Sequence, residues 1–330
     1  MGLAGRGGLG AGLFSRLFGV TIAGVFLFQF EDCAMPWPCE VRDVRYPSTA
    51  DHSEQPAKFY APGTRGAAPL LVALHPWSFD YDREQSAPYA EWCMAKGWVF
   101  IHPSFRGPNV RPEAMGSELV VKDIVSAVDF ARGAAKVDER RIYLMGASGG
   151  GYASLLMAGR APEIWAGVSA YVPIIDLAAW YKESAARKSR YADNIAAACG
   201  GAPGASAAVD EEYRRRSAAT WLANAGDVAV DINAGIHDGH TGSVPISHTL
   251  RAFNILAAPE DRLTEEEIRF FVEQEAVPPH LRMEIEDATY GAKKPLFRRS
   301  SRRARVTIFE GGHDELFGAG LAWLERQRRG

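Results

Sequence analysis

The sequence has few cysteines, little net charge and no internal repeat. Its 4 cysteines include no C-x-x-C pair, so the pattern gives no indication of a zinc site. A formal net charge of −3 argues against a nucleic-acid-binding surface. No period of about 20–50 residues recurs, which excludes solenoids and propellers. The remaining composition, 47% apolar and 23% charged residues, is that of an ordinary soluble globular enzyme.

The N-terminus differs from the rest of the chain. Residues 1–16 are rich in glycine and contain arginines but no acid, and residues 17–30 (LFGVTIAGVFLFQF) form an apolar run. A basic flank before a short apolar core resembles a secretory signal, and the run is shorter than a membrane-spanning helix. We therefore expect residues 1–40 to be a signal-like segment with a linker on a secreted or periplasmic protein. Two alternatives stay open: an uncleaved segment that tethers the protein to a membrane, and a start placed too far upstream on a cytoplasmic protein.

The redox state of the cysteines stays open at this point. The four residues are Cys33, Cys39, Cys93 and Cys199. In an exported protein, Cys33 and Cys39 would close a small loop and the other two would pair across the fold. Free buried thiols are the equal alternative.

From residue 41 onward, short β runs alternate with helical segments, which predicts βαβ units and a mostly parallel sheet. The run 70–74 (LLVAL) is apolar throughout, as in a strand that is buried on both faces. The expected strands are 41–46, 58–61, 70–74, 98–102, 141–145, 166–172, 228–232 and 306–309, and the expected helices are 89–96, 119–132, 149–158 and 321–326. No linker divides the segment 41–330, so we expect one domain.

Three segments interrupt the alternation: 106–116, 176–225 and 260–299. Segment 176–225 is largely helical and lies between two expected strands, so we expect it to form a lid over the functional site. The basic run from Arg298 to Arg305 enters an apolar strand pattern, and we expect it to be a solvated turn rather than a contact for a polyanion.

The segment 146–150 (GASGG) matches the G-x-S-x-G pattern of a serine nucleophile. The motif alone is weak evidence, but here the expected strand 141–145 leads directly into it and a helix of small residues follows. Such a turn exposes the Ser148 hydroxyl above the sheet, and the helix N-terminus directs the Gly149 N–H toward a developing oxyanion. A phosphate-binding loop or a plain tight turn is the alternative. The context predicts a serine hydrolase of the α/β-hydrolase fold.

In this fold the chain order of the catalytic residues is serine, acid, histidine. His313 follows the strand 306–309 on a Gly-Gly loop that lets its imidazole reach the serine hydroxyl, so we expect it to be the general base. His280 follows two prolines in a polar loop and is expected to be a surface residue.

Asp238 is the expected catalytic acid, because it follows the strand 228–232. It would accept a hydrogen bond from the second ring nitrogen of His313 and fix the tautomer. Asp176, which follows the preceding strand, is the second candidate. A rival interpretation makes His237, Asp238 and His240 metal ligands, but no distant fourth ligand accompanies them.

The strand 70–74 ends in His75-Pro76-Trp77-Ser78. Pro76 has no N–H, so the backbone of Trp77 is the expected second oxyanion donor beside Gly149. The Trp77 ring would then line the acyl or leaving-group pocket. A tryptophan of the core is the alternative.

Taken together, these motifs resemble the prolyl-oligopeptidase-like (peptidase S9-like) branch of α/β hydrolases. The segments that carry the resemblance are Phe105–Asn109, Gly116–Glu118 with Asp123, Val137–Ile142 and Gly146–Tyr152. The resemblance implies a mostly parallel sheet flanked by helices and acyl-enzyme chemistry without a cofactor or metal. It also implies substrate contacts from Arg106 and Tyr152 in addition to Trp77.

Two departures from that branch shape the expected function. Its peptidases carry an N-terminal β-propeller that gates entry, whereas about 50 residues precede the fold here, and the loop after Asp238 is longer than usual. We therefore expect a carboxylic-ester hydrolase whose substrate is a small-molecule ester or an ester decoration of a polysaccharide. A peptidase is the second candidate, and a non-catalytic binding protein on the same scaffold is the third. The sequence predicts no oligomeric state.

Overall fold

The computed structural model describes residues 37–63 and 66–330. The predicted signal-like run 17–30 and Cys33 lie outside these residues. Within the described part of the chain, no helix is both long enough and apolar enough to cross a membrane.

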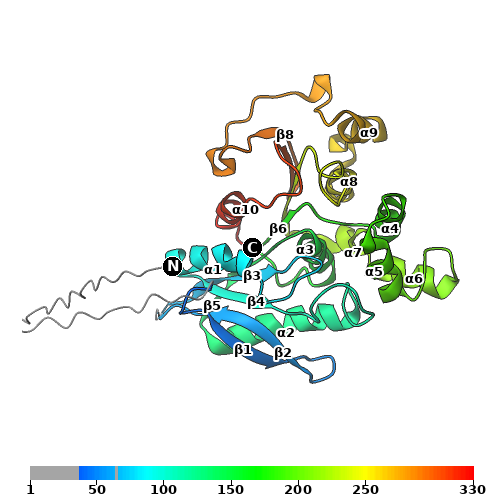
Figure 1. Cartoon of the computed structure of the whole chain (residues 1–330). Coiled ribbons are helices and arrows are strands. Elements are labelled where there is room, and N and C mark those ends of the chain that lie inside the picture. Colours follow the sequence, from blue (N-terminus) through cyan, green and yellow to red (C-terminus); the bar gives the residue numbers. More distant parts are fainter. Residues whose placement is uncertain (1–36, 64–65) are drawn as a thin grey trace, which may run out of the picture. The chain divides into compact units, whose positions relative to one another are not determined.

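Nine strands of the described residues form one sheet in the order β1-β2-β4-β3-β5-β6-β7-β9-β8 (Figure 1). Their bounds are β1 Arg42–Pro47, β2 Glu54–Tyr60, β3 Ala68–Leu74, β4 Val99–Pro103, β5 Val137–Ala147, β6 Gly167–Tyr171, β7 Ala229–Gly235, β8 Pro295–Ser301 and β9 Ala304–Phe309. The six central strands, β4-β3-β5-β6-β7-β9, pair in parallel. At the two edges of the sheet, β1, β2 and β8 make antiparallel pairs.

Helices cover both faces of the sheet, which explains why the central strands are apolar. Every residue of β3, β4, β6 and β7 is buried, as expected for parallel strands between helical layers. The helices are α1 Ala87–Lys96, α2 Glu118–Ala134, α3 Gly149–Arg160, α4 Leu177–Ala186, α5 Arg190–Cys199, α6 Ala207–Arg216, α7 Ala218–Trp221, α8 Ser247–Leu256, α9 Glu265–Gln274 and α10 Phe317–Leu324. In Figure 1, α1 and α10 lie on one side of the sheet and α2 on the other. This is the predicted α/β-hydrolase architecture.

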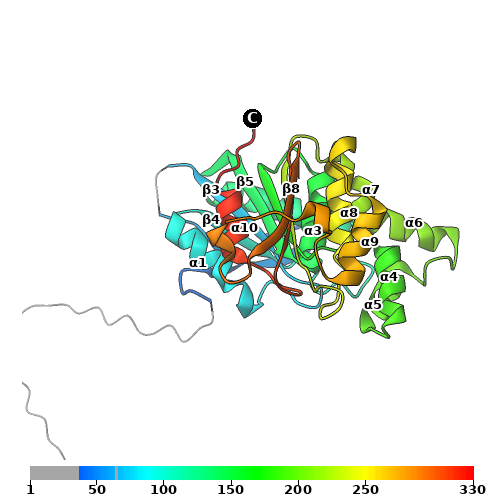
Figure 2. The ribbon, with the colours of Figure 1, turned by 90° about the horizontal axis from the view of Figure 1, so that it is seen from above.

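The insertion between β6 and β7 folds as the helices α4 to α7. Side chains of the residues before three of these helices cap them: Asp176 accepts from two N–H groups of α4, Ser189 from one of α5 and Ser206 from one of α6. Figure 2 shows α4, α5 and α6 beyond one end of the sheet, next to α8 and α9.

The basic run is only in part the solvated turn predicted from the sequence. Arg302 and Arg303 form an exposed turn, whereas the rest of the run forms the end of β8 and the start of β9, which pair as an antiparallel hairpin. Arg298 pairs with Asp287 at 2.8 Å, and Arg305 pairs with the fully buried Asp231 at 2.7 Å. Arg298 and Arg305 therefore form ion pairs with acids of the same chain.

Cys93 in α1 and Cys199 at the end of α5 are free, buried thiols, so these two residues do not pair across the fold. Burial raises the pKa of both thiols, that of Cys199 to about 12. Cys39 is exposed.

Candidate active site

Ser148 occupies the sharp turn between β5 and α3. Its backbone has φ 56° and ψ −118°, a region that residues with a side chain rarely adopt. A Cβ atom at Gly146 would lie 2.7 Å from the carbonyl carbon of Gly150, and one at Gly150 would lie 2.2 Å from the carbonyl oxygen of Leu74. Glycine at both positions therefore lets α3 pack closely enough to hold Ser148 in this conformation.

Two backbone amides lie side by side next to the nucleophile. A Cβ atom at Gly149 would come within 2.4 Å of the backbone nitrogen of Trp77. Gly149 is the first residue of α3, where the N–H has no partner within the helix and the helix dipole favours negative charge. The Gly149 and Trp77 amides therefore both lie beside Ser148, as the sequence predicts for the two oxyanion donors.

The imidazole of His313 is held by Asp238. The His313 Nδ1 atom lies 2.8 Å from Asp238 Oδ2. The other carboxylate oxygen accepts hydrogen bonds from the backbone N–H groups of Gly239 at 2.9 Å and Val244 at 3.3 Å. Asp238 follows β7, and its side chain is 1% exposed, whereas that of His313 is 25% exposed. The pair leaves His313 Nε2 as the nitrogen that can take up a proton.

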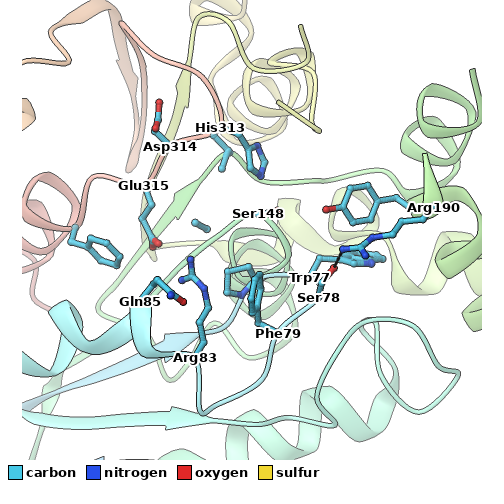
Figure 3. Close-up of a pocket in the computed structure, with 15 residues that line it drawn as sticks. Trp77, Ser78, Phe79, Arg83, Gln85, Ser148, Arg190, His313, Asp314 and Glu315 are labelled. Atoms are coloured by element: carbon cyan, nitrogen blue, oxygen red, sulfur yellow. Dashed lines mark hydrogen bonds between the residues drawn. The ribbon is translucent and has the colours of Figure 1, made fainter. Parts of the chain in front are cut away.

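Ser148 and His313 line one cavity of about 380 Å³ (Figure 3). This volume lies within the range of about 300–1,000 Å³ that is usual for small-molecule sites. The lining residues are Pro76, Trp77, Ser78, Phe79, Arg83, Gln85, Ala147, Ser148, Val172, Arg190, Tyr191, His313, Asp314, Glu315 and Phe317. They come from the loops after β3, β5, β6 and β9 and from α5 of the insertion, so the carboxyl ends of the parallel strands converge here.

The Trp77 ring belongs to both the core and the cavity wall. The residue is 1% exposed and lines the cavity. Its ring packs edge to face against two aromatic rings of the insertion. The ring centres lie 4.7 Å apart for Trp180 of α4 and 6.3 Å apart for Tyr191 of α5. The segment 176–225, which the sequence predicts to be a lid, thus supports one side of the cavity.

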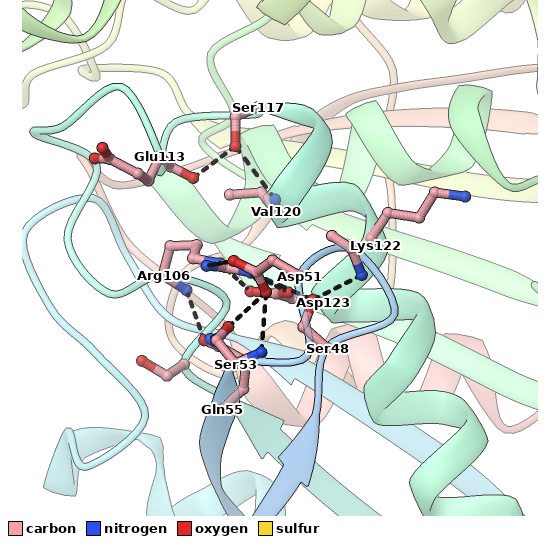
Figure 4. A network of polar contacts seen from close by, with 12 residues as sticks. Ser48, Asp51, Ser53, Gln55, Arg106, Glu113, Ser117, Val120, Lys122 and Asp123 are labelled. Atoms are coloured by element: carbon pink, nitrogen blue, oxygen red, sulfur yellow. Dashed lines mark hydrogen bonds and ion pairs between the residues drawn. The ribbon is translucent and has the colours of Figure 1, made fainter.

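The structure assigns the other two expected substrate contacts to packing. Tyr152 is fully buried, and its hydroxyl donates a 2.7 Å hydrogen bond to the carbonyl oxygen of Arg216. Arg106 contacts Asp123 of α2 at 2.6 Å and Asp51, between β1 and β2, at 2.8 Å (Figure 4). Neither Tyr152 nor Arg106 is among the cavity-lining residues. The Arg106 side chain thus links its loop to α2 and to the β1–β2 connection and does not reach the cavity.

The rival candidates from the sequence have other partners. The Asp176 carboxylate caps α4 by accepting from the N–H groups of Ala178 and Ala179. His280 is exposed and contacts Glu267 at 2.8 Å. His237 contacts Glu275 at 2.7 Å, and the hydrogen bond raises the pKa of its imidazole.

The sequence does not predict four charged side chains of the cavity. Arg83, Arg190, Asp314 and Glu315 lie on loops or at the start of a helix, where no motif spacing marks them. The Tyr89 hydroxyl donates a hydrogen bond to Glu315. Burial raises the pKa of the Glu315 carboxyl to about 7, against the opposing effects of Tyr89 and of the charges on Arg83 and His313. The position of Glu315 two residues after His313 is the one signal that could have pointed to it.

Among solved structures, the chain is similar in fold to several peptidases. The acylaminoacyl peptidase of Pyrococcus horikoshii has a TM-score of 0.55 and 17% identity over 83% of this chain and 37% of its own. A puromycin-hydrolyzing peptidase of Mycobacterium tuberculosis has a TM-score of 0.55 and 15% identity over 86% of this chain and 38% of its own. Prolyl oligopeptidase B from Galerina marginata has a TM-score of 0.51 and 18% identity over 66% of this chain and 31% of its own. The chain thus spans about a third of the length of these structures.

No protein of curated function matches the chain in sequence. The model of the prolyl oligopeptidase family matches residues 89–275, which is more than half of the chain and includes Ser148 and Asp238. The structure adds the Trp77 and His313 loops on either side of that match. The chain belongs to the prolyl oligopeptidase family, peptidase S9, and has the α/β-hydrolase fold.

Proposed function

We propose that the chain is a serine peptidase that cleaves an amide bond of a small peptide or acylated amino acid through an acyl-enzyme on Ser148. One observation carries the proposal: the 2.8 Å contact between His313 and the buried Asp238, at a cavity that Ser148 lines. A carboxylate, an imidazole and a hydroxyl in this order are the parts of a serine-hydrolase triad.

In the first half-reaction, His313 Nε2 takes the proton of the Ser148 hydroxyl while Oγ attacks the scissile carbonyl carbon. The N–H groups of Trp77 and Gly149 donate hydrogen bonds to the resulting oxyanion. The C–N bond then breaks, and the imidazolium gives its proton to the departing amine. The acyl group remains on Ser148.

In the second half-reaction, His313 takes a proton from water while the water oxygen attacks the acyl carbon. The bond to Ser148 Oγ breaks, Oγ regains its proton from His313, and a carboxylic acid leaves. The cycle consumes one water and requires no cofactor. Asp238 stays ionised and stabilises the imidazolium in both steps.

Family membership supports an amide substrate over an ester. The structures of similar fold from Pyrococcus, Mycobacterium and Galerina are named as peptidases. Because the same acyl-enzyme forms more readily when an alkoxide leaves, we also expect ester cleavage as a second activity.

The test combines a fluorophosphonate probe with matched aryl amides and aryl esters of the same short acyl groups. The wild type should be labelled at Ser148 and should turn over the amides, whereas Ser148→Ala should do neither. Labelling of Ser148 with turnover of esters alone would replace the peptidase proposal by the esterase. An unlabelled Ser148 in folded protein would reject both.

A further inference from the structure

Two arginines of the cavity have no part in the acyl transfer described above. Arg83 lies on the loop between β3 and α1, and Arg190 is the first residue of α5. Both line the cavity together with Ser148 (Figure 3). We propose that Arg83 forms an anion subsite that binds a carboxylate of the substrate beside the scissile bond, with Arg190 as a second positive charge at the rim. This inference rests on the proposed reaction at Ser148 and adds the chemical class of its substrate.

The Arg83 guanidinium has N–H donors that are available to a ligand. Its central carbon lies 5.0 Å from the centre of the Phe79 ring, which supports the side chain along the cavity wall. Within the described residues, its one side-chain hydrogen bond is a long one of 3.5 Å from Nη1 to Ser86 Oγ. Its Nε atom is buried and has no hydrogen-bond partner in the described part of the chain. Because a guanidinium carries five N–H donors and a buried unpaired donor is costly, Arg83 is suited to gain a partner from the substrate.

Arg190 approaches the cavity from the insertion. It is exposed, and its Nη2 atom lies 3.3 Å from Ser78 Oγ. Figure 3 shows Arg83 and Arg190 on opposite sides of Phe79. Among the side-chain contacts of the described residues, neither arginine has a carboxylate partner.

The acids of the cavity do not cancel these charges. Asp314 is already neutralised by Lys293, whose Nζ atom lies 2.6 Å away, and it also accepts from the N–H of Gly312. Glu315 is bonded to Tyr89, and its raised pKa of about 7 keeps it partly protonated at neutral pH. Within the described residues, Arg83 and Arg190 thus have no carboxylate partner and Glu315 is only partly charged, which leaves the cavity positive beside Ser148.

A carboxylate is the anion that fits this arrangement. The planar fork of a guanidinium matches the two oxygens of a carboxylate, and such charge-assisted pairs are stronger than neutral hydrogen bonds. A peptide supplies carboxylates on acidic side chains and at its C-terminus, so the ligand is available within the proposed substrate class.

The test compares a carboxylate with a carboxamide of the same shape, on either side of the scissile bond. In the first arm, the charge is on the acyl side: aryl amides and aryl esters of glutaric acid, which keep one free carboxylate, are compared with the same compounds in which that carboxylate is a carboxamide. In the second arm, the charge is on the leaving-group side: N-acetyl-3-aminobenzoic acid is compared with N-acetyl-3-aminobenzamide. In at least one of the two arms, the wild type should prefer the carboxylate over the carboxamide by about tenfold or more in kcat/KM. Arg83→Gln should reduce that preference to less than about twofold, and Arg83→Lys should retain part of it.

Lys182→Gln is the matched control, because it removes one positive charge from an exposed residue of the insertion that does not line the cavity. It should keep the wild-type preference. Equal turnover of carboxylate and carboxamide in both arms, or a preference that survives Arg83→Gln, would overturn the anion subsite.

A second measurement does not depend on turnover or on a variant that folds. Glutarate should slow the labelling of wild-type Ser148 by the fluorophosphonate more strongly than glutaramide does. If no amide is cleaved but glutarate still protects, the peptidase proposal fails and the anion subsite stands. If amides are cleaved and neither compound protects, the subsite fails and the peptidase stands.

Discussion

Asp238 acts in the proposed mechanism only through His313, and this makes its role testable against the second acid candidate. Asp238→Asn keeps the shape of the side chain but offers an NH₂ group or an uncharged oxygen to the imidazole, so the tautomer and the imidazolium lose their support. We expect kcat to fall by ~10³–10⁴. Steady-state kinetics on the purified variant measures the loss.

Asp176→Asn is the matched control for that substitution. Asp176 caps α4 through Ala178 and Ala179, and asparagine is an equally good N-cap residue. We therefore expect nearly unchanged kcat and thermal stability. A larger loss in Asp176→Asn than in Asp238→Asn would move the catalytic acid to Asp176.

Glu315 should make the protein less stable at higher pH. Its pKa is about 7 in the folded protein against a usual value of 4.5, mainly because of burial. The folded state therefore holds a proton that the unfolded state releases, and the free energy of unfolding should fall as the pH rises from about 4.5 to 7. Arg83 and His313 limit the shift, and the Tyr89 hydroxyl bonds to the carboxyl. Glu315→Gln removes this titration.

Urea unfolding of wild type and Glu315→Gln at pH 5 and pH 8 tests the effect. The difference in unfolding free energy, Glu315→Gln minus wild type, should be more positive at pH 8 than at pH 5, by up to about 3 kcal/mol. A gain that is the same at both pH values would contradict the raised pKa.

At the residue scale, the sequence predicts those side chains whose place depends on a local pattern. Ser148 is predicted from the strand, the G-x-S-x-G motif and the helix that stand in sequence around it. His313 and Asp238 are predicted from the order of the strands that precede them. The structure brings the latter two into contact. Arg83 and Glu315 were not predicted, because their approach to the cavity depends on how separate loops pack and not on spacing within one loop.

At the scale of elements, the turn that holds Ser148 requires close packing of α3 against β3. A methyl group at Gly150 would meet the carbonyl oxygen of Leu74 at 2.2 Å, and a backbone atom in a central strand cannot move aside. Gly150→Ala should therefore lower the unfolding free energy by about 3 kcal/mol or more. It should also abolish the reaction of Ser148 with a fluorophosphonate.

Gly133→Ala is the control for helix propensity. Gly133 lies in α2, and a methyl group there would meet nothing within 4 Å. The substitution should stabilise the protein by about 0.5–1 kcal/mol. Denaturant unfolding of both variants checks the pair, and equal stability of the two would contradict the close approach at Gly150.

The elements that the sequence predicts well are the buried parallel strands, because burial on both faces makes them continuous apolar runs. β8 and α8 were not predicted. β8 carries Arg298 and Arg299, and its charged pattern hides a strand whose polar side chains find partners such as Asp287 and the carbonyl oxygen of Asp261. α8 follows the glycine- and proline-containing loop of Asp238, and its own segment contains neither residue.

At the scale of the whole molecule, the described residues form the fold that the similar structures share. The aligned part is about a third of those chains. In the described residues, α4 and α5 support the cavity wall through Trp180 and Tyr191. Selection of the substrate is thus expected to depend on this insertion and on the charges of Arg83 and Arg190.

The last prediction concerns the segment 1–40. Its basic flank and the apolar run 17–30 are typical of a secretory signal, so we expect the mature protein to start after about residue 30 and to be found outside the cytoplasm. The N-terminus of protein purified from its native host, determined by mass spectrometry together with cell fractionation, is the measurement. The buried thiols Cys93 and Cys199 do not argue against export, because burial protects them from oxidants and raises their pKa, and the thiolate is the reactive form. An intact Met1 on soluble cytoplasmic enzyme would contradict the prediction and favour a start placed too far upstream.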